Sequence, residues 1–245
     1  SPIPFEKRYP YQVGFLLMDI CNLQCKHCYL MDPDDDGVPW QNGRFAKGFM
    51  GMDLFHKIVD RLEDVLVNSK LISLSAVESL YHPDIWEIFS RLREVNNDLT
   101  FSVVSNGMIL NENNVLKLKA VGNVDLGISL DGCRKETVEK FKTGVKFDRV
   151  IRNMKFLKQH NVKYRTNFVA HKGNIGELLD YVDFCYELGV KSIKVNTLCP
   201  HDLQFSSQTL VAKGKSELSE IETISKVLLG LRTSAFINSG KHPLL

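Results

Sequence analysis

Short apolar runs alternate along this chain with longer segments in which apolar residues recur every third or fourth position. Nearly continuous runs of Val, Ile, Leu and Phe are typical of buried strands, and the three-to-four spacing is typical of amphipathic helices. The apolar runs predict six strands, at residues 13–18, 71–75, 99–104, 124–129, 163–169 and 192–196. The segments between them predict helices. The first two have Asp53 and Asp84 as N-caps, and the apolar face of the first begins at Leu54.

Strands that alternate with helices in this way form parallel sheets with right-handed crossovers. Six strand–helix units predict an α/β fold, a partial (β/α)6 TIM-like barrel that stays open because eight units close such a barrel. We expect residues 1–200 to form this barrel and residues 201–245 to form a C-terminal tail with one helix, either a short end or a truncated extension. In this class of fold the reactive groups lie in the loops that follow the strands.

Three cysteines, Cys21, Cys25 and Cys28, follow the first predicted strand at C-x3-C-x2-C spacing. Thiolates ligate metals, and three of them on one short loop can converge on one iron–sulfur cluster. The gaps are too short for disulfides to be the natural interpretation. A tetrahedral zinc site would require a fourth Cys or His nearby, and His27 is poorly placed to turn onto the same ion. Iron and sulfide are therefore favoured, with zinc as the alternative.

The cysteine spacing, with the following Tyr29, closely resembles the signature of the radical S-adenosylmethionine (SAM) enzymes. The resemblance implies a [4Fe-4S] cluster in which the three cysteines ligate three irons and SAM binds the fourth through its amino and carboxylate groups. It also implies that His27 offers its backbone to the adenine of SAM and that Tyr29 shields the cluster.

Segments after the next three strands carry the same resemblance, which covers roughly residues 11–200. Residues 75–84 resemble the family's SGGEPLLHPD segment, residues 105–107 resemble TNG, and residues 129–132 resemble SLDG. The residues that the resemblance implies for SAM binding are Ala76, Glu78, Asn106, Ser129 and Lys142. Among them, Glu78 is expected at the amino group of SAM, and Lys142 stands where relatives often carry an arginine that pairs with the carboxylate.

Two departures from the family pattern leave an alternative open. Ala76 and Val77 replace both glycines of SGGE, and glycine is the residue that lets a backbone approach a ligand closely. Lys142 cannot reproduce the two-pronged contact of an arginine. The alternative is a degenerate member, a binding or regulatory module that holds a cluster without cleaving SAM. The intact set of three cysteines argues against it.

The other three cysteines occupy different kinds of position. Cys185 falls within a helical pattern and is expected to be a buried, inert thiol. Cys133 follows the fourth predicted strand and Cys199 the sixth, so both are expected at the mouth of the barrel. Either is a candidate catalytic residue that donates a hydrogen atom to a substrate radical, or a ligand of a second cluster.

The resemblance implies an enzyme that reductively cleaves SAM to a 5′-deoxyadenosyl radical, which then abstracts hydrogen from a substrate. The barrel most resembles SPASM/twitch-type members, which modify peptides, so a peptide or a small metabolite is the expected substrate. Flavodoxin or ferredoxin is the expected electron donor.

Composition limits the partners and the compartment. The balance of 31 basic and 29 acidic side chains gives no sign of a nucleic-acid partner or a membrane surface. No run approaches the roughly 18 apolar residues that span a bilayer, and the first residues lack a signal-peptide pattern. Together with clustered, reduced thiols, these features predict a cytoplasmic protein.

Overall fold

The computed structural model describes residues 9–25, 28, 48–74 and 77–198, which contain a parallel sheet of six strands. The strands, in spatial order, are β1 (Gln12–Gly14), β3 (Leu71–Ser73), β4 (Thr100–Ser105), β5 (Val124–Ser129), β7 (Tyr164–Ala170) and β8 (Ser192–Thr197). This spatial order is also the order along the chain. Right-handed crossovers between successive neighbours place all the connecting helices on one side of a sheet, as in a barrel. The predicted partial barrel is therefore confirmed.

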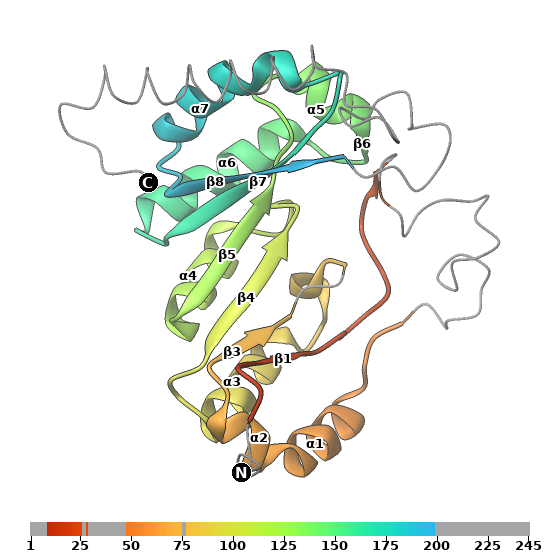
Figure 1. Cartoon of the computed structure of the whole chain (residues 1–245), viewed down its shortest axis with the longest axis vertical. Helices are drawn as coiled ribbons and strands as arrows, with labels where there is room; N and C mark the ends of the chain where they lie inside the picture. Colours follow the sequence, from red (N-terminus) through yellow and green to blue (C-terminus); the bar gives the residue numbers. More distant parts are fainter. Residues whose placement is uncertain (1–8, 26–27, 29–47, 75–76, 199–245) are drawn as a thin grey trace, which may run out of the picture.

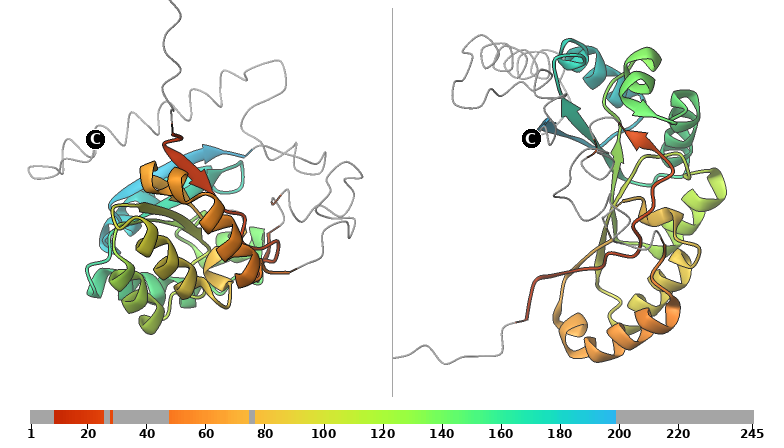
Figure 2. Two further views of the ribbon diagram at one scale, coloured as in Figure 1. Left: turned by 90° about the horizontal axis from the view of Figure 1, so that it is seen from below. Right: turned by 90° about the vertical axis from the view of Figure 1, so that its right-hand side faces the viewer.

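The helices line the outer side of the curved sheet (Figures 1 and 2). They are α1 (Met52–Arg61), α2 (Glu63–Asn68), α3 (Ile85–Val95), α4 (Glu112–Val121), α5 (Lys135–Phe141), α6 (Phe147–Gln159) and α7 (Leu178–Glu187). Two short 3-10 helices, η2 (Ser79–Tyr81) and η3 (Ile175–Glu177), precede α3 and α7. A separate antiparallel ribbon of two very short strands, β2 (Gln24–Cys25) and β6 (Lys142–Thr143), has no counterpart in the sequence prediction.

The two faces of the sheet differ in chemistry. On the outer face, Phe101 of β4 is fully buried against α3, and its ring centroid lies 4.9 Å from that of Phe89. On the inner face, Asn167 of β7 lies in register with Ser129 of β5, and its buried Oδ1 atom has no hydrogen-bond partner among the described residues. The bare backbone of Gly127 makes room for Asn167, because a Cβ atom there would come within 3.1 Å of the Asn167 amide nitrogen. The helices thus cover the apolar face and leave the polar face toward the inside of the barrel.

The first predicted helix differs from the structure in three respects. Its N-cap is Gly51 rather than Asp53, and no side chain caps it. The helix is interrupted at Leu62, which separates α1 from α2. The apolar face is displaced by one position, because Leu54 is 54% exposed whereas Phe55 is fully buried. The spacing of apolar residues did not decide which of the two side chains packs against the sheet. In the structure the larger one, Phe55, is buried there.

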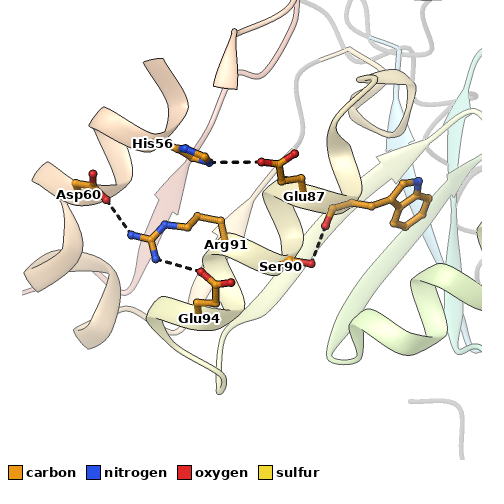
Figure 3. A network of polar contacts seen from close by, with 7 residues as sticks. His56, Asp60, Glu87, Ser90, Arg91 and Glu94 are labelled. Carbon is orange, nitrogen blue, oxygen red and sulfur yellow. Dashed lines mark hydrogen bonds and ion pairs between the residues drawn. The ribbon is translucent and has the colours of Figure 1, made fainter. Parts of the chain in front are cut away.

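A polar network links α1 to α3 on the outer surface (Figure 3). Arg91 lies 2.8 Å from Asp60 on α1 and 3.5 Å from Glu94 on its own helix. His56 lies 3.8 Å from Glu87. The acidic partners are largely exposed, so each pair contributes at most about 1 kcal/mol, and the apolar contacts beneath them hold the helices in place.

No helix of the described residues is long and apolar enough to cross a membrane. The predicted C-terminal tail, residues 201–245, lies outside the described residues.

Candidate active site

The cysteine loop follows the first strand, as predicted, and runs past the carboxyl ends of the sheet strands. Two hydrogen bonds between residues close in sequence shape this loop. The Leu23 amide donates to the Cys21 sulfur at 3.4 Å, and the Cys28 amide donates to the Cys25 carbonyl at 3.0 Å. The second cysteine belongs to strand β2, where its Cα partner across the ribbon is Lys142 of β6. This ribbon fastens the loop to the segment that follows α5.

The three thiols of the loop are partly buried, and none forms a disulfide. Burial raises the pKa of Cys21, and it raises the pKa of Cys25 to about 11. The other two thiols add to this shift, and the positive charge of Lys142 opposes it. A bound cation would favour the thiolate forms of the three cysteines.

Glu78, at the end of β3, is completely buried beside the end of β4. Its carboxylate accepts hydrogen bonds from the Ser105 hydroxyl and from the Asn106 amide, both at 2.7 Å. Burial raises the pKa of Glu78 to about 7, and the two hydrogen bonds and the charge of Lys142 oppose that shift. A carboxylate in these surroundings would be stabilised by a cationic ligand such as an ammonium group.

The side chain of Asn106 connects this carboxylate with the cysteine loop. Its amide nitrogen donates to the side-chain oxygen of Asn22 at 2.8 Å, across 84 positions of sequence. Its side-chain oxygen accepts from the Met108 amide at 3.0 Å, which fixes the turn after β4. Gly107 completes this turn with a φ of +77°, a conformation that glycine adopts without steric cost. The carboxyl end of β4 therefore holds both Glu78 and the loop.

Ser129 and Lys142 meet at the end of β5. The ammonium of Lys142 donates to the Ser129 carbonyl oxygen at 2.7 Å and lies 3.1 Å from a carboxylate oxygen of Asp131. The other oxygen of Asp131 accepts from the Val169 amide at 2.8 Å. The predicted residues after β3, β4 and β5 are thus gathered around the cysteine loop at one end of the sheet.

Comparison with known proteins identifies the family of this chain. The model of the family described as the radical SAM superfamily matches residues 15–185. The chain belongs to the radical SAM superfamily. It is 27% identical over 195 residues to the AdoMet-dependent heme synthase of Methanosarcina barkeri, a match that covers 78% of this chain and 51% of that protein. The chain thus spans about half the length of this curated relative.

Solved structures of SAM-bound proteins have the same fold. The structure called native anSMEcpe with bound AdoMet matches 93% of this chain and 62% of its own, at a TM-score of 0.72 and 17% identity. SuiB of Streptococcus suis bound to S-adenosylmethionine matches 92% of this chain and 48% of its own, at a TM-score of 0.69 and 18% identity. These neighbours show that the barrel of this chain has the fold of the SAM-bound structures.

The family uses a [4Fe-4S] cluster and SAM, and the chemistry of the donor set fits that cluster. Three thiols on one loop match the three irons that the protein would coordinate. Among the described residues, no group of three or more Cys, His, Asp or Glu side chains is arranged to hold a single metal ion. A cluster requires a different arrangement of ligands from a single ion, because each thiolate binds a different iron.

Four of the predicted site residues lie outside the described part of the chain: His27, Tyr29, Ala76 and Cys199. Cys133 is described. Its sulfur lies 3.6 Å from a carboxylate oxygen of Glu177, at the start of α7, and burial and this carboxylate raise its pKa to about 11. Cys185 is buried as predicted, with 1% of its surface exposed.

The sequence interpretation missed two residues of the site, Asn22 and Asp131. Asp131 lies within the segment that resembles SLDG, so the sequence places it after the fourth predicted strand. The sequence does not show that it pairs with Lys142. Asn22 lies inside the cysteine spacing, and only its contact with Asn106 distinguishes it from an ordinary loop residue.

Proposed function

We propose that this chain is the catalytic core of a radical SAM enzyme that reductively cleaves SAM and abstracts a hydrogen atom from a substrate. Cys21, Cys25 and Cys28 would hold the [4Fe-4S] cluster. When bound, the cluster would deliver one electron to SAM, whose carbon–sulfur bond breaks to give methionine and a 5′-deoxyadenosyl radical. The cluster would be reduced by a donor such as flavodoxin or ferredoxin.

One observation supports this proposal above the others: the hydrogen-bonded chain from Glu78 through Asn106 to Asn22. It joins the carboxylate expected at the amino group of SAM to the loop expected to hold the cluster. SAM bridges these two places in the family, because its amino and carboxylate groups bind the iron that the protein leaves free. A network that fixes their separation would hold SAM with its sulfonium near the cluster.

The roles of the protein groups follow from their surroundings. Glu78 would accept the ammonium of SAM, which supplies the positive charge that its buried carboxylate favours. Ser129 and Asn106 would help to position SAM. Contacts from His27, Tyr29 and Ala76 are proposed on the resemblance, which also suggests a place for Lys142 at the carboxylate of SAM.

The substrate is proposed to be a peptide or a small metabolite. The solved structures of similar fold include SuiB bound to its precursor peptide SuiA and anSMEcpe bound to a Cp18Cys peptide. The inner face of the sheet is polar and suits hydrogen bonding to such a ligand, and the buried Asn167 oxygen is one acceptor there. Cys133 and Cys199 stay candidate hydrogen-atom donors. If neither cysteine is a hydrogen-atom donor, the Cys133→Ala and Cys199→Ala variants will form product at the rate of the unaltered chain.

The test is anaerobic reconstitution with iron and sulfide, followed by reduction in the presence of SAM and an assay for 5′-deoxyadenosine. About four irons per chain and SAM-dependent 5′-deoxyadenosine are expected, and both should be lost together when the three cysteines are replaced by alanine. A cluster that forms but neither cleaves SAM nor changes its spectrum when SAM is added would favour the degenerate module. A chain that binds zinc and no iron would contradict the proposal.

A further inference from the structure

Lys142 is a buried ammonium held from several directions. Its side chain is 3% exposed, and that of its partner Asp131 is 2% exposed. The ammonium donates to the Ser129 carbonyl oxygen and forms an ion pair with Asp131 at 3.1 Å. Asp131 is itself fixed, because its other carboxylate oxygen accepts from Val169 and its carbonyl oxygen accepts from Asn174 at 2.9 Å. The lysine is therefore locked to β5 and β7, and not free to follow a ligand.

The same lysine is the direct partner of a cysteine. Cys25 and Lys142 are Cα partners in the antiparallel ribbon of β2 and β6. Side chains directly opposite one another in such a pair point to the same face, with Cβ atoms about 4.5–5.5 Å apart. The side chains of Lys142 and Cys25 therefore lie on the same face of the ribbon.

The ribbon also brings a buried charge to the cysteine loop. Lys142 lies directly opposite Cys25 in the ribbon, whereas its partner Asp131 lies outside the ribbon, just beyond the end of β5. The positive end of the buried ion pair is therefore the end that belongs to the ribbon.

We propose that Lys142 is a positioning residue for the cluster loop, which holds Cys25 through the ribbon and presents a fixed positive charge to the cluster bound there. This inference rests on the proposed function, since it takes Cys25 to be a cluster ligand. It differs from the role suggested by the family resemblance, in which Lys142 contacts the carboxylate of SAM. The ammonium already donates to the Ser129 carbonyl oxygen and is paired with Asp131, and a lysine lacks the planar pair of donors that an arginine presents to a carboxylate.

Two variants test the proposal. Lys142→Met removes the charge and keeps the length of the side chain, and the double variant Lys142→Met/Asp131→Asn removes the pair, so no buried carboxylate is left without a cation. An asparagine oxygen at position 131 can still accept from the Val169 amide. Lys140→Met is the matched control, because it removes an exposed lysine two positions away.

The first measurement is hydrogen exchange of the chain before reconstitution. The amides of residues 23–25 should exchange about tenfold faster in both Lys142 variants than in the unaltered chain, and the control should not differ from it. Equal exchange rates would overturn the positioning role. This measurement requires no cluster, so it decides the role of Lys142 even if the proposed function fails.

The second measurement is the midpoint potential of the reconstituted cluster. Reduction adds negative charge, which a nearby cation stabilises, so removing Lys142 should shift the midpoint to a more negative potential in both variants and leave the control unchanged. The same sign is expected in the double variant, because the positive end of the pair lies on the ribbon that carries Cys25 and the negative end lies outside it. An unchanged midpoint, together with weaker binding of SAM, would overturn the proposal and assign Lys142 to the SAM carboxylate instead.

Discussion

Replacing Glu78 by glutamine should change how the stability of the chain depends on pH. Burial raises the pKa of this carboxyl from 4.5 to about 7 in the folded chain. A group whose pKa is raised by folding binds its proton more tightly in the folded state, so stability is lost as pH rises from about 4.5 to about 7. The penalty from ionisation, worked from these two values, is about 1 kcal/mol at pH 5 and about 3 kcal/mol at pH 8.

A glutamine carries no charge at either pH and keeps an oxygen that can accept from the Asn106 amide. The free energy of unfolding of Glu78→Gln minus that of the unaltered chain should therefore increase by about 2–3 kcal/mol from pH 5 to pH 8. The free energy of unfolding is measured by urea denaturation at both pH values, under reducing conditions with a chelator present. Glu94→Gln is the control, because Glu94 is exposed and its replacement should give the same difference at both pH values. An equal effect of Glu78→Gln at pH 5 and pH 8 would refute the argument that burial governs this carboxyl.

Two further predictions concern the scaffold. Arg93→Ala should destabilise the chain by about 2–4 kcal/mol in urea denaturation. The guanidinium of Arg93 donates to four carbonyl oxygens at or beyond the ends of α3 and α4, and it lies 4.5 Å from the centre of the Phe101 ring. Arg91→Ala, on the same helix, removes only surface ion pairs and should cost less than about 1 kcal/mol; equal losses for the two arginines would contradict this reasoning. Gly107→Ala should destabilise the chain by about 1–3 kcal/mol, because φ is +77° and the new Cβ would come within 3.0 Å of Val150. The same free energy of unfolding as in the unaltered chain would show that the turn after β4 tolerates a side chain.

The fold was predictable because it depends on patterns that repeat. The strand at residues 124–129 was predicted with the bounds it has in the structure. The first strand was less well predicted: the apolar run reaches residue 18, but β1 ends at Gly14. Beyond Gly14, Phe15, Leu17 and Met18 are buried, whereas Leu16 is 47% exposed. The hydrogen bonds of this segment are made partly with the segment around Phe49 rather than within the sheet. Hydrophobicity reports burial, and burial does not distinguish a strand from an extended segment packed at its end.

The sequence by itself determined the class of fold, the three cysteines and the polar residues after the strands, because each of these depends on local spacing. The tertiary structure alone decided which of those residues meet. The ribbon of β2 and β6 is too short to leave a pattern, and the contact between Asn22 and Asn106 joins residues 84 positions apart. The ion pair of Lys142 with Asp131 depends on how α5 returns the chain to the end of β5. Such contacts are set by the path of the whole chain, and no local preference of the residues involved encodes them.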